Sequence, residues 1–60
     1  MMRVTIRQCE QPADTYHVFV GNWAFPHFDF GFHSGKTARK IKRLFDSGDM
    51  IAAIKESRKD

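Results

Sequence analysis

The sequence contains a single cysteine, Cys9, and no uninterrupted apolar run of the length, about 18 residues, that a membrane span needs. One cysteine cannot form an internal disulfide, and small secreted domains usually carry several. The amino-terminal residues alternate charged and apolar side chains, so they lack the apolar stretch of a signal peptide. We therefore expect a cytoplasmic protein without a membrane segment.

Proline is also scarce, with two residues, and the sequence has no internal repeat or low-complexity linker. Residues 1–60 are therefore expected to form one domain, with a thin core made from a few large side chains. An active site usually needs a pocket of about 300 Å³ or more, which so thin a core rarely encloses. These features favour a binding module over an enzyme.

Three segments have the pattern of β-strands. In the first segment, about residues 3–9, apolar and polar side chains alternate. The second segment, about residues 15–21, is rich in β-branched and aromatic residues. About 27–33 alternate for seven residues, which predicts that Phe28, Phe30 and Phe32 share the core face. The short separations predict an antiparallel sheet.

The period changes to that of a helix over about residues 36–57. Ser34 or Thr37 is suited to cap its start, and Gly48 lies where a left-handed residue would end a first helix. Asp49 is suited to cap a second helix, although a single helix weakened by Gly48 fits the pattern too. The predicted fold class is α+β, with one broken or two short helices packed on one sheet face.

Positive charge is concentrated in the predicted helical region. Residues 1–33 carry two basic and three acidic residues, whereas residues 34–60 carry eight basic and four acidic ones. On the helix face opposite the apolar residues, the spacing places a stripe of four cations: Lys36, Arg39, Lys40 and Arg43. Such a stripe is either a solvated helix face or a contact surface for phosphate groups.

The predicted uncovered face of the sheet supplies a second set of candidate binding residues. The alternation places Arg3, Arg7 and Phe19 there, together with Thr5, His17, His27, Asp29 and His33. Arginines beside an aromatic ring suit a groove of DNA or unpaired bases. The interpretation favoured by these patterns is a nucleic-acid-binding module that uses both the helix stripe and this sheet face.

The segment Gly31-Phe32-His33-Ser34-Gly35-Lys36-Thr37 is close to a phosphate-binding loop but is one residue too short between its first glycine and Gly-Lys-Thr. NTP hydrolysis is therefore not expected. A helix start at Ser34–Thr37 would still offer free N–H groups to an anion, or would simply be a capped turn.

No catalytic, metal or cofactor site is expected. His27 and His33 lie roughly 20 Å apart on one strand, too far to share an ion. Cys9 and Ser34 lack the local signature of a nucleophile, and the acidic residues are scattered singly.

The order of three strands followed by a helix resembles in layout the small DNA-binding domains at the amino terminus of tyrosine integrases. The segment from Thr37 to Lys55 is similar to the recognition-helix and glycine-turn segment of excisionase-type regulators. The helix that precedes this segment in a helix-turn-helix is missing, since an aromatic strand stands in its place.

The alternative hypothesis is a small inhibitor or adaptor, of the kind that phages and mobile elements encode, that binds a larger protein or nucleoprotein complex. Trp23, Phe25, Phe19 and Tyr16 exceed what a thin core can cover, and Trp and Tyr are enriched at interfaces. Exposed aromatics and an uncovered strand edge also favour a homodimer.

Overall fold

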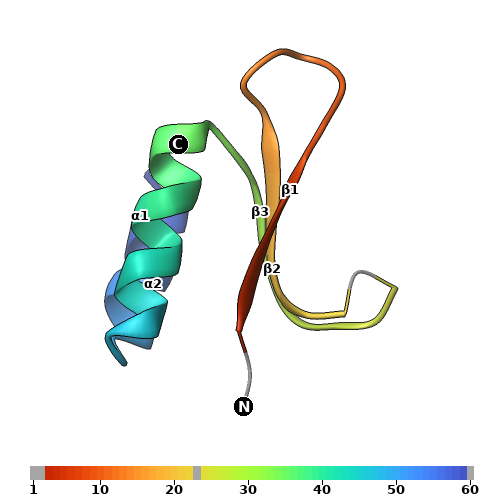
Figure 1. The fold of residues 1–60 in the computed structure, drawn as a ribbon. Helices are drawn as coiled ribbons and strands as arrows, with labels where there is room; N and C mark the ends of the chain where they lie inside the picture. Colours follow the sequence, from red (N-terminus) through yellow and green to blue (C-terminus); the bar gives the residue numbers. More distant parts are fainter. Residues whose placement is uncertain (1–2, 23, 60) are drawn as a thin grey trace.

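A computed structural model describes residues 3–22 and 24–59 of the chain. It contains a three-stranded antiparallel sheet in the order β1-β2-β3, followed by two helices, which confirms the α+β prediction (Figure 1). The five elements are β1 (Val4–Gln8), β2 (Tyr16–Gly21), β3 (Pro26–His33), α1 (Gly35–Asp46) and α2 (Met50–Ser57). Of the two alternatives for the carboxy-terminal region, two short helices are observed.

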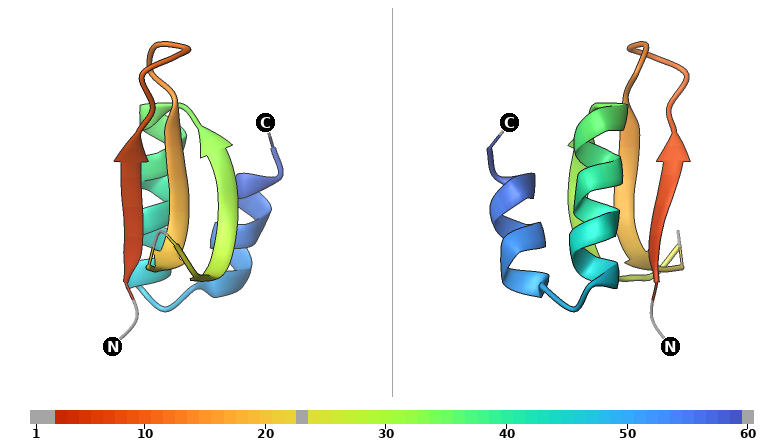
Figure 2. Two further views of the ribbon diagram at one scale, coloured as in Figure 1. Left: turned by 90° about the vertical axis from the view of Figure 1, so that its right-hand side faces the viewer. Right: turned by 60° about the vertical axis from the view of Figure 1, so that its left-hand side comes forward.

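The elements form two layers. Both helices lie on the same face of the sheet, with α1 beside β1 and β2 and α2 beside β3 (Figure 2). The opposite face of the sheet is not covered by a helix in either view. The chain therefore has two separate outward surfaces, the outer side of the helices and the open face of the sheet.

The core lies between these layers. In β1 and β2 the alternation of side chains turns Val4, Val18 and Val20 toward the helices, where each is at most 4% exposed. Ala38 and Ile41 of α1 and Ala53 of α2 are fully buried against them. Apolar residues recur every second position in the strands and every three to four positions in the helices, which places them at the interface between the sheet and the helices.

The helix boundaries follow from local chemistry. Ser34 Oγ accepts the backbone N–H of Thr37 at 3.4 Å and caps α1. At the other end Gly48 has a φ of +88°, and the N–H groups of residues 48 and 49 donate to carbonyls of the last turn, a Schellman motif. Asp49 then caps α2 by accepting the N–H of Ala52 at 3.0 Å. These three signals were predicted and are confirmed.

Strand β3 departs from regular alternation. Val18 pairs with Gly31 and Phe19 pairs with Asp29, so Phe30 is an extra residue that has no partner of its own on β2. Gly31 adopts a φ of +91°, a backbone conformation that residues with a Cβ rarely adopt. The result is a β-bulge, which reverses the faces of the residues that follow it.

The bulge corrects the predicted faces of β3. Phe30 is 5% exposed and belongs to the core, but Phe32 is 62% exposed and pairs with His17 of the open face. His33, expected on the open face, is 7% exposed, and its Nε2 donates to the Phe30 carbonyl at 2.7 Å. The prediction that three phenylalanines share the core face is wrong for Phe32.

Candidate nucleic-acid interface

The four predicted cations of α1 lie together on its outer side. Ala38 and Ile41 point to the sheet. At 3.6 residues per turn the four cations lie on the opposite side of the helix and point away from the sheet. All four are exposed, and they line one hollow of about 390 Å³ on the surface. The members of this α1 stripe are Lys36, Arg39, Lys40 and Arg43.

One member of the α1 stripe is already engaged. Lys40 Nζ lies 3.3 Å from Glu56 Oε1 of α2, and Lys59 Nζ contacts the same carboxylate at 3.3 Å. Desolvation raises the pKa of Glu56, but the two lysines outweigh it, so the pKa lies below the ordinary value. Among the described residues, the other three stripe cations form no ion pair, so their charge is directed to solvent.

The amino terminus of α1 is occupied by the chain itself. Asp14 Oδ1 accepts the N–H of Gly35 at 3.3 Å, which leaves this donor satisfied without an external anion. A Cβ at Gly35 would lie 3.0 Å from both Asp14 Oδ1 and Tyr16 Cε1. The glycine before Lys36 is thus explained by packing, and the segment that resembles a phosphate-binding loop is a capped helix start.

The open sheet face carries the other predicted cations. Val4 and Ile6 contact the core, so their neighbours Arg3 and Arg7 project from the opposite side of β1, where both are exposed. Helix α1 covers the other face of the sheet (Figure 2), and the α1 stripe lies on the side of that helix opposite its buried residues, so this surface and the α1 stripe are on opposite sides of the two layers. The structure therefore separates two groups that the sequence interpretation combined, and one straight duplex can contact only one of them.

Phe19 is not an exposed contact residue. It projects on the open-face side of β2, yet it is 1% exposed and its ring centroid lies 4.8 Å from that of His17. The prediction that Phe19 is exposed to solvent on this face is therefore wrong. Trp23, the remaining predicted contact residue, lies outside the described residues.

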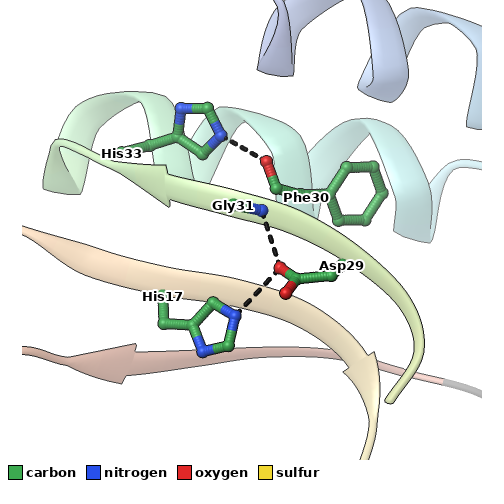
Figure 3. Close-up of polar contacts among 5 residues, drawn as sticks. All are labelled: His17, Asp29, Phe30, Gly31 and His33. Atoms are coloured by element: carbon green, nitrogen blue, oxygen red, sulfur yellow. Dashed lines mark hydrogen bonds and ion pairs between the residues drawn. The ribbon is translucent and has the colours of Figure 1, made fainter.

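A hydrogen-bonded pair that the sequence did not predict joins β2 to β3. His17 Nε2 lies 2.9 Å from Asp29 Oδ1, and the same oxygen accepts the N–H of Gly31 at 2.8 Å (Figure 3). A carboxylate only accepts, so Nε2 carries the hydrogen. Partial burial raises the pKa of Asp29, but the Gly31 N–H and the His17 ring overcome this and hold it below its ordinary value.

Both residues of this pair had been assigned to the open face. The pairing itself depends on the register between two strands, for which the spacing along the chain gives no signal. The described part of the chain contains no group of three or more His, Cys, Asp or Glu side chains that could hold a metal ion.

Several apolar side chains remain exposed. Phe25 is 84% exposed at the turn before β3, Phe28 is 39% exposed, and Ile51 of α2 is 68% exposed. In the described ranges, neither helix has the length and apolar character needed to cross a bilayer.

No family model matches the sequence, and comparisons with curated proteins and with solved structures find no match either.

Proposed function

We propose that this protein is a small non-enzymatic module that acts in the cytoplasm and binds the phosphate backbone of a nucleic acid through the α1 stripe. The observation that carries the proposal is that Lys36, Arg39 and Arg43 share one outward surface and have no carboxylate partner within residues 3–22 and 24–59. Like charges gathered in this way repel one another, and phosphate groups relieve that repulsion while they release condensed counterions.

The length of the stripe suits a few phosphates. From Lys36 to Arg43 the helix advances by about 10 Å, at 1.5 Å per residue. One strand of B-DNA carries a charge about every 3.4 Å along the axis, so the stripe is long enough for about three phosphates. Phosphate contacts carry no sequence information, and we expect binding that is largely independent of sequence.

The experiment is a fluorescence-anisotropy titration of a mixed-sequence duplex at about 50 and 200 mM salt. Three phosphate contacts predict a loss of about 40-fold in affinity over this range. The double variant K36E/R43E should abolish measurable binding at the higher salt. Lys40 is left unchanged, since Glu56 already holds it.

The matched control is K55E/R58E, which makes the same change of net charge at exposed positions in α2 and directly after it. It should weaken binding far less than the stripe variant. Equal effects of the two double variants would show that only net charge matters and would refute a site on α1. Circular dichroism of both variants checks that they fold.

Glu56 offers a second test of the stripe. The variant E56Q removes the carboxylate that holds Lys40 and should raise duplex affinity by roughly threefold, with a steeper salt dependence. Unchanged affinity would mean that Lys40 does not reach phosphate.

A second candidate function is the binding of another protein or of a second copy. It is favoured by Phe25, which is 84% exposed in the described structure and close in sequence to the partly exposed Phe28. Sedimentation velocity over a range of concentrations tests the homodimer. Association that F25S abolishes would support it, and a monomer at all concentrations would refute it.

A further inference from the structure

The open face of the sheet carries a row of side chains that crosses all three strands. Arg7 of β1 pairs with His17 of β2, and His17 pairs with Phe32 of β3. Directly paired residues point to the same face, so the cation and the two rings stand side by side. The bulge at residue 30 produces this row, because regular alternation would have turned Phe32 into the core.

The two rings form a stacked pair. The His17 and Phe32 ring centroids lie 4.7 Å apart, and the ring planes differ by 16°. The His17 side chain is 14% exposed, whereas Phe32 is 62% exposed. One side of the Phe32 ring is occupied by His17, and much of the rest of the ring is open to solvent. A flat ligand can extend this stack on Phe32.

The pair is held in place before any ligand arrives. Asp29 fixes the orientation of the His17 ring through the 2.9 Å contact, and Gly31 in turn holds the carboxylate at 2.8 Å (Figure 3). Phe19 lies on the same face two residues further along β2, is 1% exposed, and has its ring centroid 4.8 Å from that of His17, so the His17 ring is also packed on this side. A preorganised aromatic surface loses little conformational entropy on binding.

The charge around the rings favours an anionic ligand. Arg3 and Arg7 are exposed on the same face, and the carboxylate of Asp29, which contacts the His17 ring, is engaged by His17 and Gly31. A nucleotide combines a flat ring, which can stack on Phe32, with a negatively charged phosphate. In a duplex the bases are stacked inside, so only an unpaired base can lie against Phe32.

We propose that the open sheet face is a second, separate nucleic-acid site that binds single strands by stacking an unpaired base on Phe32, with Arg7 close to the backbone. This site does not depend on the α1 stripe, which lies on the other side of the molecule (Figure 2). The two sites also differ in what they recognise, since the stripe contacts phosphates of either strand state and the ring pair requires a free base.

The experiment compares a labelled twelve-residue oligothymidylate with an abasic strand of the same length, at about 150 mM salt. Wild-type protein should bind the thymidylate strand more tightly. The variant F32L removes the flat ring but keeps an apolar side chain, and it should weaken thymidylate binding about 5- to 50-fold while leaving abasic binding unchanged. The matched control is I51A, which truncates an apolar side chain of α2 that is 68% exposed and outside the row, and it should have no effect.

Three outcomes would overturn the proposal: equal binding of the two strands by the wild type, equal thymidylate binding by F32L and wild type, or concentration-dependent self-association that F32L abolishes. The last would show that a second copy covers Phe32. Duplex binding serves to separate the two proposals. F32L should leave it unchanged, and K36E/R43E should reduce it while the preference for thymidylate over abasic strand persists.

Discussion

The burial of Phe19 leads to a quantitative prediction. Phe19 and Phe32 lie on the same side of the sheet, but they are 1% and 62% exposed. Truncation of a fully buried phenylalanine to alanine costs about 3–5 kcal/mol. Scaled by the fraction of surface that is covered, the cost for Phe32 is about 1–2 kcal/mol.

The assay is urea denaturation followed by circular dichroism. A 60-residue domain has a free energy of unfolding of about 3–9 kcal/mol, so F19A should remove a large share of it or unfold the chain. The milder variant F19L, expected to cost about 1–2 kcal/mol, keeps the comparison measurable. F32A should remain folded with a slightly lower midpoint.

A loss of less than about 1 kcal/mol in F19A, or a loss no larger than that in F32A, would contradict the burial of Phe19. Such a result would mean that Phe19 is accessible in solution. Phe19 would then return to the set of binding residues from which its burial removes it.

Two further predictions concern β3. Replacing Gly31 by L-alanine should cost about 1–2 kcal/mol of unfolding free energy, because the φ of Gly31 is +91°. D-alanine at this position, introduced by chemical synthesis, should cost little. Equal losses for the two variants in urea denaturation would contradict the bulge. Because the folded-state pKa of Asp29 is lowered, its stabilising contribution is present above the unfolded pKa of about 4 and is lost as pH falls through the folded value. Urea midpoints measured from pH 6 to 2 should therefore fall less below pH 4 in D29N than in the wild type, and parallel curves would contradict the role of the carboxylate.

The element order was predictable because the sequence changes once, after residue 33, from the patterns of strands to the period of a helix. Two alternating segments and a helical stripe define the layers, and Ser34, Gly48 and Asp49 mark the helix ends by chemistry that acts within a few residues. None of these signals requires knowledge of a distant contact.

The bulge could not be derived from alternation alone, because the segment from His27 to His33 alternates along its whole length. The available signal was Gly31, since a glycine inside a strand often marks a bulge. Whether the register shifts there depends on β2, and so the faces of Phe32 and His33 were predicted wrongly.

The candidate surfaces were predictable to different degrees. The α1 stripe follows from helical spacing within eight residues, and its exposure is as expected. The contact between His17 and Asp29 and the burial of Phe19 depend on how strands and side chains meet in space. Such contacts have no counterpart in the spacing of residues along one segment.

The most direct test of the account is an NMR titration of the isotopically labelled protein with a mixed-sequence duplex. Amide shifts confined to residues 36–43 and the turn before them are the predicted result, with the open sheet face unaffected. Shifts centred on β1 and β3, or no shifts at millimolar concentration and low salt, would contradict the assignment of α1 as the surface that binds the phosphate backbone.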